Sequence, residues 1–167
     1  MLKTFCISLM AISFVFVMVF FPGQNTAEGK TNWQLTCDTN KRLCHMISAL
    51  KNKNARVISV FRLQKVNSRK LNGKITMAML DIPLGLHIPS GVIIRVDKKV
   101  TIKATLVDCL KKGCRAVFNA TSKVIDAMQK GSYATVHIVD SKTRKKLILN
   151  YSLVGFTKTW SSFQQRS

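Results

Sequence analysis

From Trp33 onward, short apolar segments alternate with clusters of turn residues, and this spacing limits the possible folds more than any other feature. The segment 100–107 has the clearest pattern, because Val100, Ile102 and Ala104 alternate with polar residues. A period of two with one polar face is typical of a strand that packs on one side and meets water on the other. A regular succession of such segments predicts an all-β protein, and we expect an antiparallel β-sandwich.

The sequence predicts two helices within this strand-rich pattern. A short internal helix is expected over 122–130, with Ser122 as its cap and Gly131 after its end. A short C-terminal helix is expected over 156–163, with Trp160 and Phe163 facing inward. Strands are predicted over 33–37, 43–50, 56–66, 74–80, 92–96, 100–107, 115–118, 133–139 and 146–154.

One connection has an unusual composition. Residues 82–91 are apolar but contain Pro83 and Pro89, which exclude regular ladder hydrogen bonds. We therefore expect a buried, extended connection that crosses the end of the sheet. An apolar groove near Pro83–Gly91 would suit a chaperone-like interaction module.

The amino terminus has the pattern of a secretory signal. Lys3 precedes a mostly apolar run over residues 5–21, which Pro22 and Gly23 end. We predict a signal peptide over 1–27, followed by one domain over 28–167. A retained membrane anchor is the alternative, because the apolar run is at the short end of what spans a bilayer.

The four cysteines after this leader fall into two close pairs, Cys37 with Cys44 and Cys109 with Cys114. Four cysteines allow three connectivities. Each close pair flanks a predicted turn between strands, so local pairing within disulfide reach is favoured. Zinc knuckles use shorter spacings such as C-x2-C, and no metal site is expected. Disulfides agree with an exported protein.

The charge is strongly unbalanced, with 27 Lys and Arg against 7 Asp and Glu and a net charge of +20. Such a surface attracts anions, for which lipopolysaccharide, acidic lipid and sulfated glycan are candidates. A merely solvated surface is the alternative, although solubilising surfaces usually mix both signs. Specific nucleic-acid binding is not expected, because surface aromatic residues are few. The residues proposed to bind anions are Lys98, Lys99, Lys111, Lys112, Lys142, Arg144, Lys145 and Lys146.

The sequence holds no recognisable catalytic motif. There is no G-x-S-x-G, no phosphate-binding glycine loop and no H-E-x-x-H. His45, His87 and His137 have no ligand spacing, and His87 is expected to be buried and hydrogen-bonded. We therefore expect neither an enzyme nor a cofactor; a polar pocket joining His87 to an acid would revive the enzyme hypothesis.

Several motifs together resemble a known family. They are Trp33 with Cys37 and Cys44; Ile82-Pro83-Leu84-Gly85-Leu86 with Pro89, Gly91 and Val96-Asp97; Cys109 with Gly113-Cys114 and Ala116; and Ser152-Leu153-Val154-Gly155-Phe156. The combination resembles the invasion-associated locus B family of exported proteins from Gram-negative bacteria. The resemblance implies a β-domain in the periplasm, at the outer membrane or secreted, and in some pathogens a link to host-cell invasion. It implies no catalytic residues.

These observations predict a non-enzymatic exported protein that binds anionic envelope or host components through its basic surface and assists host association.

Overall fold

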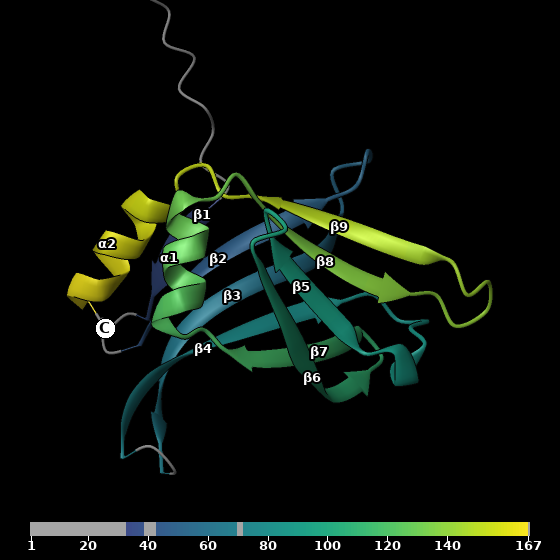
Figure 1. Ribbon diagram of the computed structural model, residues 1–167, viewed down its shortest axis with the longest axis horizontal. Helices are drawn as coiled ribbons and strands as arrows, with labels where there is room; N and C mark the ends of the chain where they lie inside the picture. Colours follow the sequence, from purple (N-terminus) through teal and green to yellow (C-terminus); the bar gives the residue numbers. More distant parts are fainter. Residues whose placement is uncertain (1–32, 39–42, 70–71, 167) are drawn as a thin grey trace, which may run out of the picture.

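Nine antiparallel strands form one continuous sheet in the part of the chain that the structure describes (Figure 1). The structure is a computed structural model that describes residues 33–38, 43–69 and 72–166, so the predicted leader over 1–27 lies outside the described residues. The strand order is β1-β2-β3-β4-β7-β6-β5-β8-β9. The strands are β1 (Trp33–Cys37), β2 (Cys44–Lys51), β3 (Val57–Ser68), β4 (Gly73–Ile82), β5 (Val92–Val96), β6 (Val100–Leu110), β7 (Gly113–Asn119), β8 (Tyr133–Val139) and β9 (Lys146–Ser152).

The all-β prediction is confirmed, but one curled sheet replaces the two packed sheets of the predicted sandwich. The register shifts between Leu50 and Lys51 and between Leu106 and Asp108. Such irregularities bend strands and increase their twist. The curl brings opposite edges of the sheet together, because the Trp33 indole Nε1 on β1 donates to the Ser152 carbonyl on β9 at 2.9 Å. A sheet that curls this far encloses a core without a second sheet.

Aromatic side chains fill the inner face of the curl. The Trp33 ring lies 5.4 Å from Phe61 and 5.0 Å from Phe156, both edge to face. Such pairs add roughly 0.5–1.5 kcal/mol each beyond their area burial. Helices α1 (Ser122–Lys130) and α2 (Phe156–Arg166) lie beside the sheet and bury their apolar stripes in this core (Figure 1).

The predicted elements are present, with small differences at their ends. The internal helix begins and ends where the sequence predicts, but Thr121, rather than Ser122, is the residue at its N-cap. Trp160 and Phe163 of the C-terminal helix are buried, as expected. This helix continues to Arg166.

The prediction of a buried connection over 82–91 is wrong. Only Ile82, the last residue of β4, is buried, whereas Leu84 is 53% exposed and Ile88 is 59% exposed. A short 3-10 helix, η1 (Ile88–Ser90), ends the segment. The main chain of Gly85 and His87 bonds to the hairpin of β8 and β9. This pairing holds the connection at the end of the sheet and leaves Leu84 and Ile88 exposed to solvent.

Candidate functional site: a basic rim

Four connections lie at the same end of the sheet, on the right of Figure 1. They join β2 to β3, β4 to β5, β6 to β7 and β8 to β9. Register places them together, because Asp81 near the end of β4 pairs with both Val60 near the start of β3 and Arg115 near the start of β7. We call this end the basic rim. Its nine basic residues are Lys51, Lys53, Arg56, Lys111, Lys112, Lys142, Arg144, Lys145 and Lys146.

The connection over 83–91 is tied to the β8–β9 turn by main-chain hydrogen bonds. The His87 amide donates to the Val139 carbonyl at 2.7 Å, and the Ser141 amide donates to the Gly85 carbonyl at 2.7 Å. Leu86 and Asp140 form an isolated antiparallel bridge between them. Two separate connections of the rim therefore behave as one unit.

His87 adds a side-chain link to the same unit. Its Nε2 lies 2.7 Å from the Arg144 guanidinium, and its Nδ1 lies 2.7 Å from the Ser90 hydroxyl oxygen. A guanidinium only donates hydrogen bonds, so Nε2 accepts and the proton of the neutral ring is on Nδ1. His87 is hydrogen-bonded, as expected, although it is only partly buried.

Asp140 organises the turn that carries most of the cations. One carboxylate oxygen accepts from the Lys142 amide at 3.1 Å, the Thr143 amide at 2.7 Å and the Thr143 hydroxyl at 2.8 Å. These hydrogen bonds, led by the one from the Thr143 amide, hold the pKa of Asp140 below its ordinary value. The carboxylate is thus engaged by the turn itself, while Lys142, Arg144 and Lys145 remain exposed.

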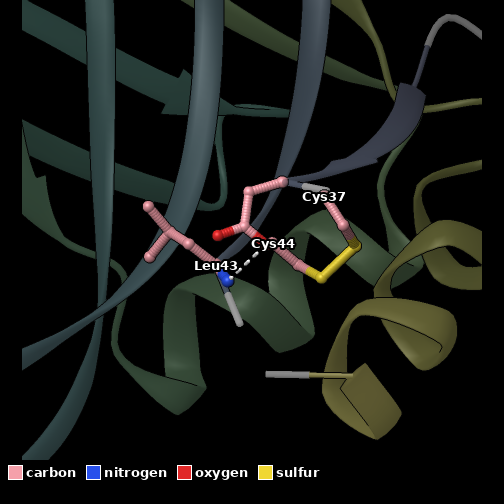
Figure 2. Close-up of a disulfide and its surroundings, with 4 residues drawn as sticks. Cys37, Leu43 and Cys44 are labelled. Carbon is pink, nitrogen blue, oxygen red and sulfur yellow. Dashed lines mark hydrogen bonds between the residues drawn. A yellow bond between two sulfur atoms is a disulfide. The ribbon is translucent and has the colours of Figure 1, made fainter. Parts of the chain in front are cut away.

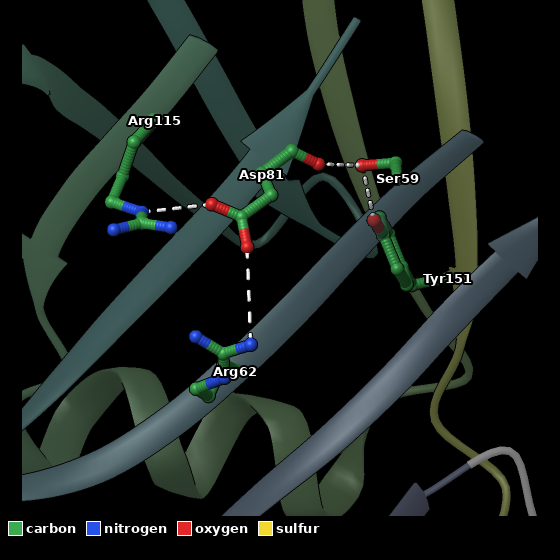
Figure 3. Close-up of polar contacts among 5 residues, drawn as sticks. All are labelled: Ser59, Arg62, Asp81, Arg115 and Tyr151. Atoms are coloured by element: carbon green, nitrogen blue, oxygen red, sulfur yellow. Dashed lines mark hydrogen bonds and ion pairs between the residues drawn. The ribbon is translucent and has the colours of Figure 1, made fainter. Parts of the chain in front are cut away.

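A second carboxylate near the rim is shared by two arginines. Figure 3 shows Asp81 between Arg115, whose Nε lies 2.8 Å from Oδ1, and Arg62, whose Nη2 lies 3.9 Å from Oδ2. The hydrogen bond and the charge of Asp81 raise the pKa of Arg115, with a smaller contribution from the charge of Asp108. Asp81, Asp108 and Arg115 also line a shallow cavity of about 540 Å³ beneath the β6–β7 turn, together with Leu110, Lys111, Lys112, Gly113 and Cys114.

The structure divides the predicted anion-binding residues between two ends of the sheet. Six of the eight, at 111–112 and 142–146, lie on the basic rim. Lys98 and Lys99 lie at the opposite end, because they precede β6 whereas Lys111 follows it. Lys99 lines a small cavity there with Lys130 of α1. Lys51, Lys53 and Arg56 join the rim; their clustering in a turn was visible in the sequence, but their proximity to the other turns was not.

Both cysteine pairs form the disulfides that their spacing favoured. Cys37 and Cys44 are directly paired on β1 and β2, with Cα atoms 4.0 Å apart (Figure 2). Cys109 and Cys114 are paired across β6 and β7, with Cα atoms 3.9 Å apart. The second disulfide fixes the base of the turn that carries Lys111 and Lys112.

The three histidines have different surroundings. The two ring nitrogens of His87 contact Ser90 and Arg144. Burial, then the charges of Arg95 and Lys146, lower the pKa of His137. Burial, then the charge of Arg62, lowers the pKa of His45. Within residues 33–38, 43–69 and 72–166, no group of three or more His, Cys, Asp or Glu side chains could hold a metal ion.

These features define a class of protein: a curled antiparallel sheet with two local disulfides and a basic rim. Its helices within the described ranges are all too short or too polar to cross a membrane. The sequence model of the invasion associated locus B (IalB) protein family matches residues 33–164, and the chain belongs to this family. The disulfides and the family together support an exported protein.

A solved structure has the same fold. The crystal structure of invasion associated protein B from Bartonella henselae is similar with a TM-score of 0.70 at 19% sequence identity. The similarity covers 81% of this chain and 93% of that chain. No curated protein matches the sequence.

Proposed function

We propose that this protein is a non-enzymatic exported protein of a Gram-negative bacterium that binds anionic envelope or host molecules through the basic rim. In this proposal it is located in the periplasm, at the outer membrane or outside the cell. In this proposal, binding assists association with host cells. The invasion-associated family name supports that setting.

The main support for anion binding is the excess of positive charge on the basic rim. Nine basic residues lie there against three nearby carboxylates: Asp140 bonds to its own turn, Asp81 is paired with two arginines, and Asp108 lies opposite Arg115 on β7. All nine basic residues of the rim are exposed to water. An anion that meets this end encounters many cations and little competing negative charge, which favours capture within a Debye length.

The test compares two triple charge reversals with the same change in net charge. Lys142→Glu with Lys145→Glu and Lys146→Glu alters the rim. Lys74→Glu with Lys98→Glu and Lys99→Glu alters exposed lysines at the opposite end. Affinity is measured for a sulfated glycan and for lipopolysaccharide at several salt concentrations.

We expect the rim variant to lose at least about tenfold in affinity at ~0.1 M salt, and the matched variant to lose much less. Equal losses would mean that net charge alone matters. No loss in either variant would contradict anion binding.

The exposed apolar residues of 83–91 favour a second candidate, an interaction module that contacts an apolar partner. Binding through Leu84 and Ile88 alone would persist at high salt, whereas binding through lysines would weaken. The salt series therefore separates the two functions.

A further inference from the structure

The basic rim also carries most of the exposed large apolar side chains of the described residues. Ten such residues are exposed, and six of them lie at or near this end. The six are Val57, Leu84, Ile88, Val107, Leu110 and Leu147. Exposed apolar residues scattered singly need no explanation, but their concentration at one end does.

Apolar and basic residues alternate closely on this rim. Leu110 is 67% exposed and directly precedes Lys111 and Lys112. Leu147 directly follows Lys146 on β9. Leu84 and Ile88 lie on the connection that bonds to the β8–β9 turn, and this turn carries Lys142 and Lys145. A soluble polyanion satisfies only the lysines of such a surface and leaves its apolar tips in water.

We propose that the basic rim docks onto the surface of an anionic phospholipid bilayer. Lysines would contact lipid phosphates, while Leu84, Ile88 and Leu110 enter the boundary between headgroups and acyl chains. Basic residues near a membrane are attracted by its negative surface potential, and apolar side chains add burial. This inference rests on the proposed function and names the anionic partner of the same rim.

Both segments that carry these apolar side chains are fixed by local contacts. The hydrogen bonds of Gly85 and His87, and the contact between His87 and Arg144, hold the connection that carries Leu84 and Ile88 against the β8–β9 turn. The Cys109–Cys114 disulfide fixes the base of the turn that follows Leu110. A preorganised surface loses little conformational freedom on docking.

The experiment uses the protein purified from the bacterium that naturally produces it, so that its amino terminus is in the native state. Vesicles of phosphatidylcholine alone, or with about 30% phosphatidylglycerol, are sedimented with each variant. The apolar rim variant carries Leu84→Ser, Ile88→Ser and Leu110→Ser. The matched variant carries Leu43→Ser, Tyr133→Ser and Val154→Ser, at positions 53–55% exposed away from the rim.

We expect binding to anionic vesicles and much weaker binding to phosphatidylcholine alone. The partition coefficient of the apolar rim variant onto anionic vesicles should fall about tenfold or more, because three apolar side chains no longer enter the interface. The matched variant should bind as the unchanged protein does. Ile88→Ser alone should give an intermediate loss, and both triple variants should unfold at the temperature of the unchanged protein.

The inference is overturned if the apolar rim variant binds anionic vesicles unchanged, or if both triple variants lose equally. Binding of the sulfated glycan separates this result from the proposed function. If the apolar variant keeps both vesicle and glycan binding, the bilayer inference fails and the anionic function stands. If charge reversal at 142, 145 and 146 affects neither ligand, the function itself fails.

Discussion

Tyr151 on β9 and Ser59 on β3 join across the curled sheet, with the Tyr151 hydroxyl donating to the Ser59 hydroxyl oxygen at 2.5 Å (Figure 3). Ser59 in turn donates to the main-chain carbonyl of Asp81 at 2.7 Å. Both side chains are buried. This chain of hydrogen bonds holds the last strand against β3 and leads to the residue that pairs with Arg115 beneath the rim.

Removing Ser59 should therefore destabilise the fold more than removing the tyrosine hydroxyl. Ser59→Ala leaves the buried Tyr151 hydroxyl without this partner, at a cost of about 1–3 kcal/mol. Tyr151→Phe leaves Ser59 bonded to Asp81 and should cost about 1 kcal/mol. Urea unfolding of the two variants measures the difference, and the reverse order would show that another contact holds β9.

Alkaline unfolding should depend on Tyr151. Burial raises the pKa of Tyr151 to about 12, from 10.0. A folded-state pKa above the unfolded value means that the neutral side chain stabilises the fold below pH 10, and that this contribution is lost as the pH rises through 12. Lysines titrate in the same range, so the comparison is with Tyr151→Phe. The unfolding free energy should fall more steeply with pH in the unchanged protein; parallel curves would contradict this.

Acid should loosen the β8–β9 turn. The pKa of Asp140 is lowered by hydrogen bonds from its turn, so the stabilisation is present at neutral pH and is lost as the pH falls through the folded-state pKa. Asp140→Asn keeps the shape of the side chain but removes its charge. We expect lower protection factors against amide hydrogen exchange at 140–145 in this variant at neutral pH, and little further decrease on acidification. Unchanged protection would show that main-chain pairing alone keeps the hairpin ordered, without the Asp140 carboxylate.

Asp81→Ala should leave stability nearly unchanged and strengthen anion binding. Its ion pairs are partly solvated, with Asp81 34% and Arg115 44% exposed, so their loss should cost about 0–1 kcal/mol. The change releases Arg62 and Arg115 and adds one positive charge near the rim. Asp126→Ala on α1 makes the same charge change elsewhere. Affinity for a sulfated glycan should rise more in the first variant than in the second.

The two disulfides should differ in how fast they are reduced. Each disulfide has one buried cysteine, Cys44 at 1% and Cys114 at 4% exposed, but Cys109 is exposed whereas Cys37 is partly buried. Because exchange requires access to sulfur, a mild thiol should open Cys109–Cys114 first. Alkylation and mass spectrometry at successive times would show the order. Replacing either pair by serine should cost about 2–3 kcal/mol, since both loops are short.

The sequence predicted nine strands, both helices and both cysteine pairings. The alternation in segments such as 92–96 and 133–139, and the turns between paired cysteines, depend on neighbouring residues, so a local pattern is enough to find them. The sequence also predicted charge on turns, because turns must face water. It did not predict that 83–91 would be exposed, because its composition is that of a core segment.

Tertiary structure decided how these elements assemble. Strand β4 pairs with β7, and β5 with β8, and no local pattern encodes such neighbours. The curl follows from strand irregularities and from contacts such as that of Trp33 with Ser152, 119 residues apart. The separation of Lys98 and Lys99 from the other predicted cations follows from the same pairing. The sequence by itself determined which segments are strands and that turns are basic, since both depend on local chemistry; only long-range pairing brought those turns to one end, because register is fixed between distant residues.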